Sequence, residues 1–126
     1  MHGVDHGAEK FILRIRSWQA FQYAVEQGDV QEIEKLIING ADVNIKNRDG
    51  WTPLLLASHY GKERIVDFLL KNGANVNSQH NERMIPLILA SENGHTNVVE
   101  LLIRNGADVS IRDKEGFTPI AIAAQE

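Results

Sequence analysis

The chain has 126 residues, 43% of them hydrophobic, which suits one folded domain with a buried core. Its 17 acidic and 13 basic side chains give a formal net charge of -4, so no basic excess points to nucleic acid or an anionic membrane as the ligand. The absence of cysteine excludes disulfide bonds and thiolate metal sites and favours a reducing compartment.

Residues 1–16 form a leader before the regular part of the sequence. Its short apolar patch at residues 11–13 is interrupted by Arg14 and Arg16, so neither a secretion signal nor a membrane-spanning segment is expected. We expect the leader to be helical near residues 10–16 and frayed before them. These features predict a soluble, cytoplasmic protein.

The leader also contains the only side chains in the sequence that suggest a metal site. His2, Asp5 and His6 would share one face if the leader were helical. Gly3 and Gly7 disfavour a helix there, so the sequence predicts no metal site.

The main feature of the sequence is a repeat of 33 residues. Residues 50–54 (GWTPL) align with residues 116–120 (GFTPI) two periods later, and residues 83–87 (RMIPL) form the middle copy. The segment GANVN at residues 73–77 aligns with GADVS at residues 106–110. The chain is therefore expected to repeat one structural unit.

Each unit is interpreted as a helix, a turn, a second helix and a loop. Thr52 is a good N-cap and Pro53 a good first residue for a short helix that ends at Gly61. Apolar residues then recur at helical spacing in residues 65–70, and Gly73 follows as a left-handed stop. The polar stretch before the next Thr-Pro contains Asp-Gly and predicts a projecting finger.

These motifs resemble the ankyrin repeat, whose signature places Thr-Pro-Leu-His near its start and Gly-Ala-Asp-Val-Asn near its end. The resemblance implies an all-α fold, a solenoid of helix-turn-helix units joined by β-hairpin-like fingers. It covers residues 17–126, with units at about 17–46, 47–79 and 80–112 and a partial unit at 113–126.

The sequence departs from the family pattern at two places. The family's His after Thr-Pro-Leu is Leu55, Ile88 or Ala121, so the usual hydrogen bond of that side chain is absent. In the third unit Arg83 replaces Gly and Ile85 replaces Thr. A forced positive φ and a lost cap each cost on the order of 1 kcal/mol, so we expect this unit to be the weakest.

The two ends of the repeat array differ. Glu32 and Lys35 occupy the positions of Ile65 and Phe68 one period later, which predicts the polar outer face of a capping unit. The last unit stops inside its first helix, which suggests a fragment of a longer protein, self-association or disorder. Its apolar residues would then face water in part: Ile120, Ile122 and Ala124.

No phosphate-binding loop, dinucleotide-binding turn, zinc-protease helix or nucleophile elbow occurs, so neither enzyme activity nor a cofactor is expected. The resemblance implies a non-enzymatic module that binds a partner protein on the concave surface of fingers and first helices. The alternative is an architectural solenoid segment of a larger scaffold, channel or toxin. Nucleic acid and membrane are not expected partners.

One large apolar residue per unit precedes the Thr-Pro position and is a candidate anchor for the partner: Trp18, Trp51, Met84 and Phe117. His59 and Tyr60 are expected to border the same groove. The expected polar rim consists of Arg48, Asp49, Glu82, Lys114 and Glu115. In the other interpretation the anchors pack neighbouring fingers together.

Asn44 has two interpretations. Its spacing from Leu36 and Asp42 resembles that of ankyrin asparagines that are hydroxylated in animal cells. The simpler interpretation, which we favour, is that its side chain caps the loop.

Overall fold

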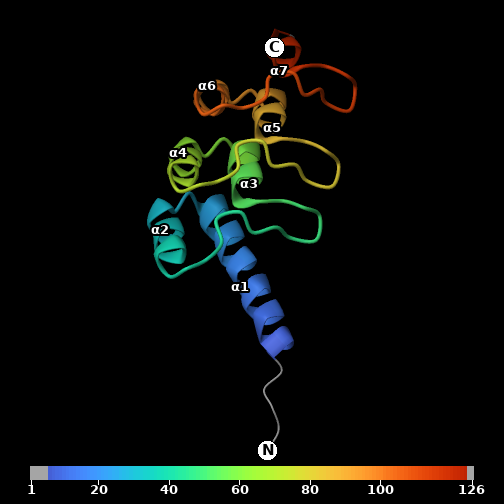
Figure 1. The fold of residues 1–126 in the computed structure, drawn as a ribbon. Helices are drawn as coiled ribbons and strands as arrows, with labels where there is room; N and C mark the ends of the chain where they lie inside the picture. Colours follow the sequence, from blue (N-terminus) through green and yellow to red (C-terminus); the bar gives the residue numbers. More distant parts are fainter. Residues whose placement is uncertain (1–5, 125–126) are drawn as a thin grey trace, which may run out of the picture.

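The computed structural model describes residues 6–124, which form two columns of helices. The helices are α1 (His6–Gln27), α2 (Val30–Ile38), α3 (Pro53–Tyr60), α4 (Glu63–Lys71), α5 (Pro86–Glu92), α6 (Thr96–Arg104) and α7 (Pro119–Ala124). In Figure 1, α1, α3, α5 and α7 stack in one column and α2, α4 and α6 in the other. Three loops project from the first column, on the side away from the second. We call residues 39–52, 72–85 and 105–118 the first, second and third loop.

The boundaries of α3 agree with the sequence prediction. The Leu55 backbone N–H donates to Thr52 Oγ1 at 3.1 Å, and Pro53 is the first helical residue. The helix ends at Gly61, whose φ of 70° is left-handed. Because the cap, the proline and the glycine are local signals, their effect could be predicted without knowing the packing.

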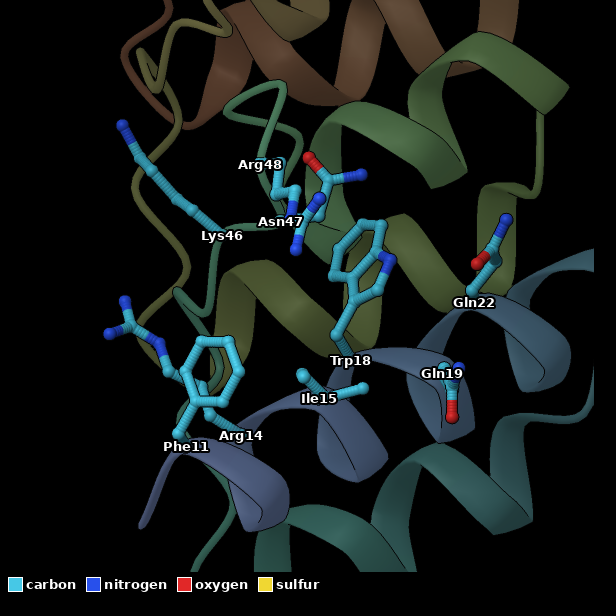
Figure 2. A pocket seen from close by; sticks show the side chains of 9 residues that line it. All are labelled: Phe11, Arg14, Ile15, Trp18, Gln19, Gln22, Lys46, Asn47 and Arg48. Carbon is cyan, nitrogen blue, oxygen red and sulfur yellow. The ribbon is translucent and has the colours of Figure 1, made fainter. Parts of the chain in front are cut away.

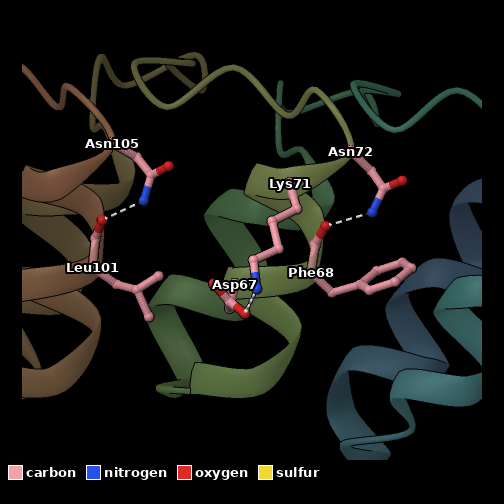
Figure 3. A network of polar contacts seen from close by, with 6 residues as sticks. All are labelled: Asp67, Phe68, Lys71, Asn72, Leu101 and Asn105. Atoms are coloured by element: carbon pink, nitrogen blue, oxygen red, sulfur yellow. Dashed lines mark hydrogen bonds and ion pairs between the residues drawn. The ribbon is translucent and has the colours of Figure 1, made fainter.

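Asparagine side chains cap the C-terminal ends of α4 and α6. Asn72 Nδ2 donates to the Phe68 carbonyl and Asn105 Nδ2 to the Leu101 carbonyl, both at 2.8 Å, as Figure 3 shows. Each bond adds a side-chain donor to a carbonyl near the end of the helix, and the Leu101 carbonyl also accepts the Asn105 backbone N–H at 3.2 Å. The sequence identified the Asn-Gly stop but not this second role of the asparagine side chain.

Helix α1 is longer than expected. Its 22 residues run without interruption from the leader into the first helix of the first unit. In Figure 1 its N-terminal half extends beyond the stacked helices. Phe11 and Leu13 in this half are 58% and 60% exposed, whereas Phe21 and Val25 in the other half are buried. Only the second half of α1 therefore belongs to the common core.

The core lies between the two columns. Leu55 and Ile88, at the position of the family's histidine, are fully buried there. Burial of each side chain stabilises the fold by roughly 1.5–3 kcal/mol relative to leaving it exposed. Ile122 in α7 is also buried, at 7% exposure, so the expected exposure of this residue is wrong. The reason is that α7 packs on α5. The side chains of Ile120 and Ala124 lie outside the described residues.

Each loop contains a tight turn. In the first loop, the Gly50 N–H donates to the Asn47 carbonyl and the Asn47 N–H to the Trp51 carbonyl, both at 3.1 Å. Equivalent bonds recur between His80 and Met84 and between Asp113 and Phe117. No β-strand forms within residues 6–124, so the β-hairpin-like character of the fingers is not confirmed.

Asn44 links two consecutive units. Its Nδ2 donates to the Gly73 carbonyl at 3.0 Å, and its Oδ1 accepts the Asn75 N–H at 2.8 Å. Asn77 repeats this arrangement with Gly106 and Asp108 in the next unit. The Asn44 amide therefore caps backbone groups of the following loop, not of the loop in which Asn44 lies.

Arg83 has a left-handed backbone, as the repeat pattern predicts. Its φ is 65°, and among the described residues it is the one non-glycine residue with a positive φ. Its exposed guanidinium makes no hydrogen bond or ion pair within the part of the chain that the structure describes. No hydrogen bond or ion pair of the Arg83 side chain within the described residues therefore compensates the strain.

We expect Arg83→Gly to raise the free energy of unfolding by about 1 kcal/mol, because glycine adopts this φ without strain. The measurement is the urea midpoint of the two proteins. Arg48→Gly is the control, since Arg48 is an exposed loop arginine without a positive φ. An Arg83→Gly midpoint at or below that of the wild type would contradict the assigned strain.

Candidate functional site

A groove of about 610 Å³ lies between the second and third loops. Side chains from these loops, from the end of the first loop and from α3, α5 and α7 contribute to it. The lining residues are Trp51, His59, His80, Glu82, Met84, Leu89, Glu92, Asp113, Lys114, Glu115, Phe117 and Ile122.

The groove is open because the second and third loops do not pair as the first two loops do. The Asn81 N–H donates to the Asp49 carbonyl and Asn81 Nδ2 to the Arg48 carbonyl, both at 2.9 Å. Gly50 permits this approach, because a Cβ there would lie 2.7 Å from Asn81 Oδ1. The first and second loops are therefore closely packed.

One period later, the two residues that make this contact are replaced. Lys114 stands in place of Asn81, and Arg83 stands in place of Gly50. The Asn77 side chain still bonds the third loop near α6, but no backbone–backbone hydrogen bond joins the second and third loops within the described residues. At their turns, an exposed ion pair between Lys114 and Glu82 joins them instead. A groove therefore remains between the second and third loops, at the position where the first and second loops are in contact.

Trp51 contacts two imidazole rings. Its ring centroid lies 5.0 Å from that of His80 and 5.7 Å from that of His59, the latter in an edge-on arrangement. Such packing restricts the rotation of a half-buried indole and leaves it preorganised for contact with another molecule. His59 and Trp51 therefore line the groove side by side.

The carboxylates of the groove fall into two groups. The hydrogen bond and charge of Lys114 hold the pKa of Glu82 below its ordinary value. Partial burial, followed by the negative charges of Asp113 and Glu115, raises the pKa of Glu92. One side of the groove thus carries a neutralised pair, and another carries an excess of negative charge.

His80 is buried in the wall of the groove, at 8% exposure. Its Nδ1 accepts the Glu82 backbone N–H at 2.9 Å, which requires an unprotonated Nδ1. Burial lowers the pKa of the imidazole, although the nearby Glu82 carboxylate opposes this effect. The folded protein therefore favours neutral His80.

Stability should fall as the pH drops below about 6.5, because the unfolded chain then binds a proton that folded His80 resists. We expect His80→Asn to reduce this fall between about pH 7 and pH 5, since asparagine retains an acceptor but does not titrate. Urea unfolding of both proteins across this range is the measurement.

The contribution of Glu92 to the pH dependence of stability needs a control, because the pKa of Glu92 is raised on folding. A raised carboxyl pKa makes the folded protein gain stability as the pH falls towards the ordinary glutamate value, the opposite sign to His80. Glu92→Gln is therefore the matched control. Identical pH profiles for wild type and His80→Asn would contradict the assigned role of His80.

The four predicted anchors differ in exposure. Trp18 and Met84 are 9% and 6% exposed, while Trp51 is half-buried and Phe117 is 37% exposed. Trp51, Met84 and Phe117 line the groove together, but Trp18 lies at a separate pocket beside α1. The anchors therefore do not form one continuous stripe.

The expected rim is also divided. Glu82, Lys114 and Glu115 line the groove, whereas Arg48 lines the pocket beside α1. Asp49 is exposed at the turn of the first loop, and Tyr60 is 45% exposed and contacts the ring of His59. Neither of these two residues lines the groove.

Sequence reasoning missed several lining residues: His80, Leu89, Glu92, Asp113 and Ile122. The repeat contained a signal for two of them. His80 and Asp113 align with Asn47, and each of the three accepts a backbone N–H two residues later. Glu92 has no such signal, because only the packing of the third loop places charges beside it.

No group of three or more His, Asp or Glu residues that could hold a metal ion occurs among the described residues. His2 and Asp5 of the considered metal site lie outside them, and His6 begins α1. In the part of the chain that the structure describes, no helix is long and apolar enough to span a membrane.

Stacked helix-turn-helix units with projecting loops define a helical repeat protein. The family model for ankyrin repeats, in three copies, matches residues 4–80, 21–113 and 77–126. The chain belongs to the ankyrin repeat family. No curated protein matches it significantly. Ankyrin repeats are generally protein–protein interaction modules and typically lack catalytic activity.

Proposed function

We propose that this protein binds a partner protein in the groove between its second and third loops, without catalysing a reaction. The main support is the pairing of a preorganised Trp51 with an exposed Phe117 in one groove. Aromatic side chains in a partly enclosed site are the usual energetic anchors of protein interfaces. The proposal places the partner on the loop and first-helix side, the concave surface implied by the family resemblance.

The charges of the groove support the same proposal. Glu92, Asp113 and Glu115 supply a polar border beside the aromatic residues, and the Glu82–Lys114 pair supplies another. An apolar centre with a charged border is the common anatomy of a protein interface. The cysteine-free sequence supports a cytoplasmic location as part of the proposal.

The architectural alternative predicts a uniformly polar surface on this side of the stack. The close contact of the first and second loops suits such a rigid spacer. The exposed Phe117 and the open groove favour binding instead.

Affinity capture with three forms of the protein tests the proposed function. Wild type and Ile103→Ser should retain the same partner, and Phe117→Ser should lose it. Ile103 is the matched control, because it is an apolar residue, 44% exposed, on α6 in the other column. Equal retention of every captured protein by all three forms would contradict the proposed site.

Self-association through the C-terminal end is a separate proposal. Ile122 is already covered within the chain, so it contributes little apolar surface to such a contact. Light scattering at rising concentration measures this association directly. A mass that stays at the monomer value contradicts self-association but does not affect the proposed groove.

A further inference from the structure

A second pocket, of about 590 Å³, lies between α1 and the first loop. Figure 2 shows its side chains, with the Trp18 indole between Ile15 of α1 and the loop residues Asn47 and Arg48. The lining residues are Phe11, Arg14, Ile15, Trp18, Gln19, Gln22, Lys46, Asn47 and Arg48.

The pocket has an apolar stripe along one face of α1. Phe11, Ile15 and Trp18 recur at spacings of four and three residues, which places them on the same side of a helix. Phe11 and Ile15 are 58% and 41% exposed, while Trp18 is buried against the core. The stripe thus passes from the solvent-exposed end of α1 to the base of the pocket.

The charge of this pocket is opposite to that of the groove between the second and third loops. Arg14, Lys46 and Arg48 line it, and no carboxylate does. The guanidinium groups of Arg14 and Arg48 have no hydrogen-bond or ion-pair partner among residues 6–124. Lys46 Nζ makes one long contact, 3.4 Å, with the Gln79 carbonyl. Uncompensated cations therefore surround an apolar surface in a chain whose net charge is -4.

We propose that this pocket binds a segment of a partner protein in which Asp or Glu side chains flank a large apolar residue. The apolar residue would pack on Phe11, Ile15 and Trp18. The carboxylates would bind Arg14 and Arg48, since a guanidinium can donate two parallel hydrogen bonds to one carboxylate. An acidic peptide fits better than nucleic acid, because the chain as a whole is acidic and the pocket is partly aliphatic. This site does not depend on the proposed groove.

Fluorescence of Trp18 can test the proposal. The chain has two tryptophans, so Trp51→Phe leaves Trp18 as the only one. The probe is the synthetic peptide Gly-Glu-Glu-Leu-Phe-Glu-Glu-Gly, with one control in which every Glu is Gln and another in which it is Lys. We expect a saturable change of Trp18 emission with the Glu peptide. Binding should be about tenfold or more weaker for the Gln peptide and undetectable for the Lys peptide.

Charge variants locate the binding. In the Trp51→Phe background, Arg14→Gln with Arg48→Gln should weaken binding of the Glu peptide by about tenfold or more. Arg64→Gln with Arg104→Gln makes the same change of net charge on α4 and α6 and should leave binding unchanged. Phe117→Ala should also leave it unchanged, which separates this site from the groove. Circular dichroism checks that each variant is folded.

Several results would overturn the proposal. Equal weakening by the two arginine pairs would show a general charge effect, and tighter binding of a single-stranded oligonucleotide would assign the pocket to nucleic acid. If the peptide binds only after residues 1–5 are deleted, the occupant of the pocket is that segment of the chain and not a partner. A concentration-dependent dimer that Arg14→Gln and Arg48→Gln abolish would assign it to a second copy of the chain.

Discussion

Phe117→Ala should weaken partner binding by about 2 kcal/mol, which is roughly a thirtyfold change in Kd. The same substitution should change the free energy of unfolding by no more than about 0.5 kcal/mol, as is usual for surface positions. The reason is that Phe117 lines the groove but is 37% exposed. Isothermal titration with the captured partner and urea unfolding measure the two effects.

Trp51→Ala should behave differently, although Trp51 lines the same groove. Its indole packs on His59 and His80, so truncation should reduce both partner affinity and stability. Comparing the two variants separates contact with the partner from support of the loops. If Phe117→Ala lowers stability strongly and preserves affinity, Phe117 is an internal packing residue and the partner binds elsewhere.

Gly50→Ala should be among the most destabilising single-methyl changes in the chain, at about 3 kcal/mol. The φ of 82° strains any other residue by about 1–2 kcal/mol. In addition, the new Cβ would lie 2.7 Å from Asn81 Oδ1 and 2.9 Å from the Asn81 backbone N. Displacing Asn81 would weaken its two hydrogen bonds to the first loop, each worth about 1 kcal/mol.

Gly116→Ala is the matched control for this change. Gly116 has a φ of 86°, but no atom of the described residues lies within 4 Å of the position that a Cβ would take there. It should therefore show the backbone strain alone, about 1–2 kcal/mol. Equal losses in the two variants would mean that the first and second loops are not packed as described.

Local features of the fold could be predicted from the sequence. Thr52, Pro53 and Gly61 act through bonds and dihedral angles within a few residues, so their pattern fixes where α3 begins and ends. The positive φ of Arg83 could be predicted for the same reason, because its aligned residues are glycines with that backbone conformation.

The candidate site could be predicted only in part. The repeat placed Trp51, Met84 and Phe117 at equivalent positions, and the structure brings these three to one groove. The repeat alone did not place Trp18 at a separate pocket, because Trp18 lies within α1 and that helix is longer than the repeat requires. The opening of the groove depends on the spacing of two loops, and a periodic pattern in the sequence does not specify that spacing.

Three differences between equivalent loop positions lie in the two loops that form the groove. Arg83 and Lys114 replace residues that hold the first and second loops together, and His80 replaces Asn47 in the turn. Sites of binding commonly retain such locally unfavourable residues, because optimal packing would fill the space that the ligand needs. The unit that we expect to be the weakest therefore contributes to the candidate site.

Hydrogen exchange in the presence and absence of the partner tests the central claim most directly. If the partner binds in the groove, its addition should slow exchange of backbone amides in residues 80–84 and 113–117, which lie in the two loops that line it. Amides of α2 and α4, in the other column, should be unaffected. Protection confined to α2 and α4, with unchanged exchange in the two loops, would contradict the proposed binding surface.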